Sequence, residues 1–526
     1  MEKKKLVVLT VLDGWGIAPP GDGNAIASAK KTNYNRFLKD FPTSQLSASG
    51  RDVGLKEDEP GNSEAGHENM GAGRTIEQDK ILISESIRDG TFFKNAAFVE
   101  ALNHAKKNRS SVHLIGLLSD ERSGHVEPEH AEALLLFFKR NNFERVYLHI
   151  LTDGRDTPPK SAEQFLKRMI LAMNSIGIGT VVTVAGRYYA MDRAHNYSRV
   201  WRAYEAMVYG RGRVAENAYQ AIQKAYNRGE TDEFIAPTVI PQPRKTGGSA
   251  PVTIKEGDSV IFYNLRSDRA RQLTRVFLQP DFIDGEAGEV WEFKKFEDLF
   301  FVTMTEFSSD FPALIAYPTR LVFNCLPAYL EKFNDVHQLY ISESEKFAHV
   351  TYFFHGNTNR VFRNEKRVRI DSRPVATFDL EPKMSAPEIT DQLVDNLRTG
   401  LYNFCLVNFP NADMLGHTGD IKAAKLGIQE IDKQLGRLWE AVRAQRGAMI
   451  ITGDHGNAEE MIDPHTKEQL QEHSRNPVPF ILLDENLRGQ SVNLRTGTLR
   501  DIAPTVLDLM GLSKPKEMLG VSLLRH

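Results

Sequence analysis

The sequence predicts an α/β protein built on parallel β-sheets, and three observations lead to this class. Short apolar runs of strand length alternate with longer, charge-striped stretches that can act as helical crossovers. These runs end abruptly in Asp, Ser, Arg or His side chains. The composition, with 41% hydrophobic and 26% charged residues, is that of an ordinary globular protein, which excludes disorder, collagen and coiled coil for the whole chain.

Eight apolar runs are the expected strands of this fold. They span residues 6–12, 112–118, 146–151, 180–185, 259–263, 338–341, 404–409 and 448–452. Polar residues follow each run, namely Asp13; Ser119 and Asp120; Asp153, Arg155 and Asp156; Arg187; Arg266, Asp268 and Arg269; Glu343 and Lys346; Asp413; Asp454 and His455. Ligands of open parallel sheets bind beyond the carboxyl ends of the strands, so we expect the functional site among these residues.

The strand ends divide the chain into two chemical kinds. Arginine-rich ends lie between residues 79 and 316, whereas Asp- and His-rich ends lie in 1–78 and 317–526. A chain of 526 residues suits about three domains of roughly 150 residues, or two larger ones. We therefore predict one domain, 79–316, inserted into another formed by 1–78 and 317–526, with the second crossing inside 303–318. The amphipathic pattern of residues 499–512 predicts a C-terminal helix that ends at Gly511.

The net charge and the cysteine content indicate which classes of partner and which cellular compartment to expect. Subtracting 69 acidic from 66 basic residues gives a net charge of -3, so neither a nucleic acid nor a membrane is expected as partner. The apolar run 6–12 is too short for a signal peptide or a membrane span. Cys325 and Cys405 lie in apolar segments, and we interpret them as buried thiols of a cytoplasmic protein. We expect a monomer acting on a small molecule.

Acidic and imidazole residues at the outer strand ends predict a metal centre. Asp413 and His417 are four residues apart, a spacing found in many metal sites, and Asp454-His455 stands at the next strand end. The alternative for this second pair is a turn capped by its Asp. Asp13 and His473 complete a set of three Asp and three His, which suits two divalent ions; carboxylate-rich coordination favours Mn²⁺, although Zn²⁺ or Co²⁺ would accept the same ligands.

Ser63 is the candidate nucleophile of this centre. It stands in Gly61-Asn62-Ser63-Glu64-Ala65-Gly66-His67, a segment that predicts the start of a helix. A serine there can be the helix N-cap, and the local sequence favours that interpretation. A helix N-terminus also attracts an anionic phosphoryl group, and a bound metal can convert the hydroxyl into an alkoxide.

Taken together, these segments resemble the cofactor-independent, or 2,3-bisphosphoglycerate-independent, phosphoglycerate mutase family of the alkaline phosphatase superfamily. The matching motifs occur in the family's order and cover nearly the whole chain. They are Leu12-Asp13-Gly14-Trp15-Gly16, Gly61-Asn62-Ser63-Glu64-Ala65-Gly66-His67, Leu151-Thr152-Asp153-Gly154-Arg155-Asp156-Thr157, Arg266-Ser267-Asp268-Arg269-Ala270-Arg271-Gln272, Ser342-Glu343-Ser344-Glu345-Lys346, Asp413-Met414-Leu415-Gly416-His417 and Asp454-His455-Gly456-Asn457.

The resemblance implies an alkaline phosphatase-like metal-binding domain with an inserted α/β substrate-binding (transferase) domain that closes over it. It implies 3- and 2-phosphoglycerate interconversion through a phosphoserine on Ser63. One Mn²⁺ would be held by Asp413, His417 and His473, and the other by Asp13, Ser63, Asp454 and His455. The phosphoglycerate would be held by His125, Arg155, Asp156, Arg187, Arg193, Arg266, Arg269 and Lys346. Asp156 would be the general acid and base, and Lys346 would neutralise the transferred group.

One motif departs from the family pattern. The family has Asp-Gly-Gly-Val-His-Ser-His after the strand, whereas here Asp120 is followed by Glu121-Arg122-Ser123-Gly124-His125-Val126-Glu127. With one inserted residue, His125 meets the first family histidine and Glu127 replaces the second.

Arginine forks bind both carboxylate and phosphate bidentately, which suits a phosphoglycerate. A mutase must also exclude water and retain glycerate until it is rephosphorylated. The alternatives are a phosphomonoesterase or phosphodiesterase lacking that retention, another phosphomutase of the superfamily such as phosphopentomutase, and a noncatalytic metal-stabilised binding protein. The run of arginines at 155, 187, 193, 266 and 269 favours the phosphoglycerate mutase.

Overall fold

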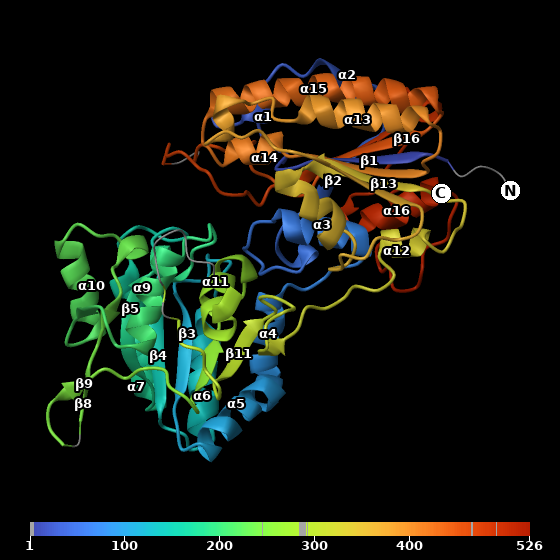
Figure 1. The fold of residues 1–526 in the computed structure, drawn as a ribbon. Coiled ribbons are helices and arrows are strands. Elements are labelled where there is room, and N and C mark those ends of the chain that lie inside the picture. The colour runs from blue at the N-terminus through green and yellow to red at the C-terminus, as the bar shows by residue number, and fades with distance from the viewer. Residues whose placement is uncertain are drawn as a thin grey trace. The chain divides into compact units, whose positions relative to one another are not determined.

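The computed structural model describes residues 5–244, 246–282, 291, 293–463, 466–490 and 492–525. The chain forms two compact units. Unit 1 comprises Met1–Gln78 and Arg320–His526, and unit 2 comprises Asp79–Thr319. Each unit has its own eight-stranded sheet (Figure 1).

The sheet of unit 1 has the strand order β14-β13-β15-β1-β16-β17-β2-β18. Its strands are β1 (Val7–Leu12), β2 (Thr43–Ser47), β13 (Gln338–Glu343), β14 (Glu365–Ile370), β15 (Phe404–Phe409), β16 (Ala448–Gly453), β17 (Val478–Leu483) and β18 (Gly497–Thr498). The strands from β14 to β16 are mutually parallel, whereas β17 is antiparallel to both of its neighbours. Parallel strands covered on both faces are apolar throughout, and β1, β15 and β16 are fully buried.

Helices cover both faces of this sheet. They are α1 (Ala25–Ser28), α2 (Thr32–Asp40), α3 (Ser63–Ala72), α12 (Leu326–Leu330), α13 (Ala386–Arg398), α14 (Asn411–Gly416), α15 (Ile421–Ala444) and α16 (Ile502–Leu509). Alternate side chains of β1 enter different cores. Val8 packs in the core that includes Ile431 of α15, whereas Val7 packs in the core that includes Val506 of α16. Figure 1 shows α13 and α15 over one face and α3 and α16 on the other.

Unit 2 is also a sheet covered by helices, with the strand order β12-β11-β10-β3-β4-β5-β7-β6. Its strands are β3 (Val112–Leu118), β4 (Val146–Thr152), β5 (Thr180–Gly186), β6 (Arg213–Val214), β7 (Thr238–Val239), β10 (Ser259–Phe262), β11 (Phe300–Thr305) and β12 (Leu314–Tyr317), and β8 (Gln242–Pro243) pairs with β9 (Ser249–Ala250) in a separate hairpin. Its helices are α4 (Asp79–Asp89), α5 (Ala96–Lys107), α6 (Pro128–Arg140), α7 (Ala162–Ile176), α8 (Arg187–Ala190), α9 (Tyr197–Val208), α10 (Ala218–Asn227) and α11 (Ser267–Leu278). The strands from β12 to β5 are parallel.

The eight strands predicted from apolar runs are confirmed as β1, β3, β4, β5, β10, β13, β15 and β16, with ends that differ by no more than two residues. The predicted C-terminal helix is α16, preceded by a 3₁₀ turn at Leu499–Asp501 and followed by Gly511 at positive φ. The second crossing was expected within 303–318; unit 2 continues through β12 to Thr319, one residue beyond that segment.

Cys325 and Cys405 are both buried free thiols, as predicted. Within the described residues, no helix combines the length and the apolar character that a membrane span requires.

Candidate active site

Three adjacent strands of unit 1 bring the predicted metal ligands to one edge of the sheet. Leu12, the last residue of β1, pairs with Phe409 of β15 and with Gly453 of β16. Asp13 and Asp454 directly follow these strands, and Asp413 lies on α14 after β15. Because the parallel strands end in register, side chains from distant parts of the sequence converge there. We call this group the acidic centre: Asp13, Ser63, Lys346, Asp413, His417, Asp454, His455 and His473.

A glycine permits the close approach of the first two loops. Gly14 has a φ of 70°, and a Cβ at this position would lie 2.6 Å from the Cα of Asp413. The backbone N–H of Asp413 donates to the carbonyl of Asp13 at 3.0 Å. Only a residue without a side chain fits this close to the backbone of Asp413.

Ser63 is the first residue of α3 and is not its N-cap. Asn62 caps the helix, its Oδ1 accepting a hydrogen bond from Ala65 N at 2.9 Å. The sequence-based preference for Ser63 as the cap is therefore wrong, because its neighbour satisfies the helix end. The Ser63 Oγ instead lies 2.7 Å from Lys346 Nζ and 3.0 Å from His455 Nε2, in a site where Ser63 is 6% exposed.

Lys346 links the nucleophile candidate to two carboxylates. Its ammonium donates to Asp13 Oδ1 and to Asp413 Oδ2, both at 2.6 Å. Burial by itself would lower the pKa of Lys346, but Asp13 and Asp413 raise it above its ordinary value. Burial likewise would raise the pKa of Asp13, but Lys346 holds it below its ordinary value. Lys346 is therefore a fixed positive charge beside Ser63.

The three predicted imidazoles face the carboxylates through Nε2. The Nδ1 of His417 lies 2.7 Å from the Gln471 carbonyl, and the Nδ1 of His473 lies 2.8 Å from the Gly61 carbonyl. The Nε2 atoms of His417 and His473 lie 3.3 and 3.2 Å from Asp413 Oδ1. Carbonyl partners on Nδ1 are the usual way in which proteins orient a histidine toward a metal.

The donor set fits divalent metal ions. Potential ligand atoms lie within 4.8 Å of one another in the set Asp413, His417 and His473 and in the set Asp13, Asp413 and His455. Asp454 is fully buried and its Oδ2 accepts no hydrogen bond among the described residues. Three buried carboxylates opposed by Lys346 leave negative charge that a cation would neutralise.

Three residues of this edge were not among the predicted site residues: His67, Asn408 and Asn457. His67 Nδ1 lies 3.4 Å from Asp454 Oδ2, and its Nε2 lies 3.1 Å from the side-chain amide nitrogen of Asn408. The same amide nitrogen of Asn408 donates to Asp13 Oδ2 at 2.7 Å, and Asn457 donates to Asp413 Oδ1 at 3.1 Å. Two signals were available: His67 stands four residues after Ser63, and Asn408 is a polar residue within an apolar strand.

The predicted substrate-binding residues of unit 2 gather at the carboxyl edge of its own sheet. They follow the adjacent strands β10, β3, β4 and β5. We call them the basic centre: His125, Arg155, Asp156, Arg187, Arg193, Arg266 and Arg269. Lys346 belongs to unit 1 and is part of the acidic centre.

Arg187 is the most buried arginine of the basic centre. It is 2% exposed, and its Nη1 lies 2.6 Å from Asp153 Oδ1 and 3.0 Å from Asp156 Oδ2. Asp156 also accepts a hydrogen bond from Ser123 Oγ at 2.7 Å. Burial would raise the pKa of Asp156, but Arg187 and Ser123 hold it below its ordinary value. Sequence reasoning missed the positioning of Arg187 by Asp153.

The other arginines of the basic centre lie near one another, so their positive charges repel. Burial and the neighbouring Arg187, Arg193 and Arg155 lower the pKa of Arg269 to about 10. Arg193 lies 3.4 Å from Asp268 Oδ2 and is largely exposed, as is Arg155. Guanidinium groups held this close together are typical of a site that accepts an anion.

His125 is buried beside these arginines despite the altered local motif. Burial, Arg187 and Arg266 lower the pKa of His125 to about 3, so its imidazole is neutral. Its Nδ1 accepts or donates no hydrogen bond among the described residues.

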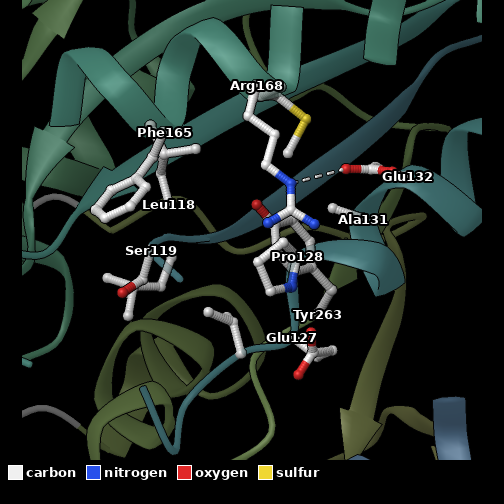
Figure 2. A pocket seen from close by; sticks show the side chains of 12 residues that line it. Leu118, Ser119, Glu127, Pro128, Ala131, Glu132, Phe165, Arg168 and Tyr263 are labelled. Carbon is white, nitrogen blue, oxygen red and sulfur yellow. Dashed lines mark ion pairs between the residues drawn. The ribbon is translucent and has the colours of Figure 1, made fainter. Parts of the chain in front are cut away.

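A small cavity of unit 2 is lined by residues that belong to neither centre. Figure 2 shows its lining, which includes Ser119, Glu127, Pro128, Arg168 and Tyr263. Its volume of about 10 Å³ leaves room for no more than one water molecule. It is too small for a phosphoglycerate.

Comparisons with known proteins identify the family of this chain. The model of the Metalloenzyme superfamily matches residues 5–514. The chain is 44% identical to the 2,3-bisphosphoglycerate-independent phosphoglycerate mutase of Acetivibrio thermocellus, covering 99% of each chain, and 45% identical to that of Clostridium kluyveri, covering 99% of this chain and 100% of the relative. It also resembles the crystal structure of Leishmania mexicana phosphoglycerate mutase at low cobalt concentration, with a TM-score of 0.78, 28% identity and coverage of 99% and 98%. The expected family and fold class are confirmed.

Proposed function

Because the chain belongs to the 2,3-bisphosphoglycerate-independent phosphoglycerate mutase family, within the Metalloenzyme superfamily, we infer that it is an isomerase that interconverts 3- and 2-phosphoglycerate. We propose further that the phosphoryl group passes through Ser63. The observation that carries this step is the environment of Ser63 Oγ, which touches Lys346 and His455 at the buried start of α3. A hydroxyl in this position is poised to become a nucleophile rather than a cap.

The acidic centre would hold two divalent ions, for which Mn²⁺ is the proposed metal. One set is Asp413, His417 and His473, and the other is Asp13, Ser63, Asp454 and His455. Bound there, the ions would lower the pKa of the Ser63 hydroxyl and stabilise charge on the phosphoryl oxygens. The support is the convergence of buried carboxylates and of imidazoles oriented through Nε2.

In the proposed reaction, Ser63 reacts as the alkoxide that bound metal would favour, and its Oγ bonds to the phosphorus of 3-phosphoglycerate while the bond to the 3-oxygen breaks. The carboxylate of Asp156 then accepts the proton of the 2-hydroxyl and passes it to the glycerate 3-oxygen. The 2-oxygen attacks the phosphoserine, which releases Ser63 as the alkoxide. Asp156 begins and ends this cycle as the carboxylate, the form that its lowered pKa favours.

The arginines would retain the glycerate between the two transfers. Arg187 is held in place by Asp153 and Asp156, so its guanidinium is preorganised for an anion. Arg155, Arg193, Arg266 and Arg269 add positive charge, and neutral His125 can hydrogen-bond the substrate. Retention of this kind distinguishes a mutase from a phosphomonoesterase, which releases the alcohol and lets water attack.

We propose that the enzyme acts as a monomer in the cytoplasm. Both centres are built from residues of one chain, and both cysteines are free and buried, which suits a reducing compartment.

The decisive experiment is a coupled mutase assay of the purified protein with Mn²⁺, run without bisphosphoglycerate and repeated with a chelator. We expect activity that the chelator abolishes and that excess Mn²⁺ restores. Activity that requires bisphosphoglycerate, or that resists the chelator, would contradict the proposal. A generic phosphate-ester hydrolysis assay run in parallel should show only slow release of phosphate.

The phosphoserine step has its own test. Ser63→Ala should lower kcat by more than about 1000-fold, because the nucleophile is removed. Bound metal, measured by elemental analysis after gel filtration, should largely persist, since the other ligands remain. Substantial mutase activity in this variant would rule out a phosphoserine on Ser63.

A further inference from the structure

Glu459 lies outside the predicted ligand sets, yet its carboxylate joins three loops of unit 1. The side chain is 2% exposed. Its Oε2 accepts hydrogen bonds from the backbone N–H groups of Gly16 and Asn457, both at 2.9 Å. Its Oε1 accepts from the hydroxyl of Ser474 and, at 3.1 Å, from Nδ2 of Asn476. One buried carboxylate thus receives four donors.

Each of these loops carries proposed metal ligands. Gly16 lies three residues after Asp13, Asn457 lies two residues after His455, and Ser474 directly follows His473. Asp13 and His455 belong to one ligand set, and His473 belongs to the other. Glu459 therefore connects segments of both sets by hydrogen bonds.

Two glycines make this arrangement possible. A Cβ on Gly16 would collide with the carboxylate of Glu459, and a Cβ on Gly456 would collide with both Glu459 and Ser474. Gly456 and Ser474 also pair with each other in an isolated β-bridge. Only glycine at positions 16 and 456 allows the loops to come this close to the carboxylate.

Asn457 extends the connection to a further ligand. Its backbone N–H donates to Glu459, while its side-chain amide donates to Asp413 Oδ1 at 3.1 Å. A shift of the loop after β16 would therefore move a hydrogen-bond donor of Asp413, the residue that faces His417 and His473.

We propose that Glu459 is a positioning residue that couples the two metal-ligand sets, so that both sets depend on one buried carboxylate for their geometry. This inference rests on the proposed function, because the ligand sets are those assigned there. A glutamine cannot replace Glu459, since its side chain offers one acceptor oxygen and turns an NH₂ group toward donors. Groups that hydrogen-bond metal ligands directly change metal affinity by about 10- to 100-fold when they are removed; Glu459 acts one step further back, through the loops that carry the ligands.

The test is Glu459→Gln, with Glu460→Gln as the matched control. Glu460 is the adjacent residue, and its carboxylate accepts from the same Asn476, at 2.8 Å. Metal-free protein is titrated with Co²⁺ by calorimetry and by its visible absorption spectrum. In Glu459→Gln we expect the affinity of both sites to fall about 10-fold, the lower end of the effect of direct partners, with a changed Co²⁺ spectrum, while Glu460→Gln behaves like the wild type. At saturating metal, kcat should fall while KM for phosphoglycerate is unchanged.

A second variant keeps the proposal open to contradiction if Glu459→Gln fails to fold. Ser474→Ala removes one donor to Oε1 without changing charge, and it should weaken one Co²⁺ site. If Glu459→Gln folds and binds Co²⁺ at both sites with wild-type affinity, this inference is overturned while the proposed function stands. If only Ser474→Ala folds, wild-type affinity at both of its sites has the same meaning. Wild-type protein that binds fewer than two ions would overturn the proposed ligand sets and this inference with them.

Discussion

Burial and neighbouring charge set the protonation state of individual side chains in both centres. Lys346 stays positive because Asp13 and Asp413 contact it, even though burial opposes its charge. Asp156 stays ionised beside Arg187. His125 stays neutral because it is buried next to cations. These states follow from contacts that no local sequence pattern contains.

A pH profile tests the state of His125. With a pKa of about 3 in the folded protein, His125 does not titrate between about pH 5 and 8. His125→Asn should therefore lower kcat/KM by about 100-fold, as loss of a well-placed hydrogen-bonding group does, without changing the shape of the profile in this window. An ionisation near pH 6.5 that is present in the wild type and lost in the variant would contradict the assignment.

The lowered pKa of His125 also determines how protein stability changes with pH. Its folded pKa lies below the unfolded value of about 6.5, so the unfolded chain binds the extra proton. Stability is therefore lost as the pH falls from about 6.5 toward 3. Urea unfolding at several pH values should show a smaller acid-induced loss in His125→Asn than in the wild type.

At the scale of elements, the two centres exist because parallel strands end in register. In unit 1 the strands β15, β1 and β16 deliver three carboxylates to one edge, and in unit 2 the strands from β10 to β5 deliver the arginines. The apolar runs predicted these strands because burial on both faces demands continuous apolar sequence. The strands β2, β14 and β18 are more polar or shorter than these, so their apolar patterns are weaker and they were not predicted.

The N-terminus of α3 is the element that positions Ser63, and its cap can be tested. Asn62→Ala removes the bond to Ala65 N and should lower the free energy of unfolding by about 1 kcal/mol. It should also lower kcat, because the first turn holds the nucleophile. The matched control is Asn217→Ala, which removes an equivalent cap from α10 in unit 2 through Gln220 N at 2.9 Å.

Asn217→Ala should show the same stability loss in urea unfolding without a loss of kcat. Equal kcat values in the two cap variants would mean that the α3 cap does not position Ser63.

At the scale of the whole molecule, each unit has its own hydrophobic cores and its own centre. Metal binding should therefore stabilise unit 1 selectively. At a free metal concentration 100 times Kd, this stabilisation is about 2.7 kcal/mol per site. In calorimetric unfolding, a chelator should lower the transition temperature of unit 1, which Asn62→Ala also lowers. The transition temperature of unit 2, which Asn217→Ala lowers, should not change with the chelator. A chelator shift confined to the latter transition would contradict the placement of the metals in unit 1.

The sequence by itself determined the fold class, the main strands, the chemical kinds of the two centres and the family, because strand burial and ligand chemistry both require particular residue types at strand ends. Only the tertiary structure decided that Asn62 rather than Ser63 caps α3, that Asn408 holds Asp13, and that Glu459 receives donors from three loops. The physical reason is distance along the chain: Asn408 lies 395 residues from Asp13, and Glu459 lies 443 residues from Gly16. Such hydrogen bonds form only when packed strands bring the loops together.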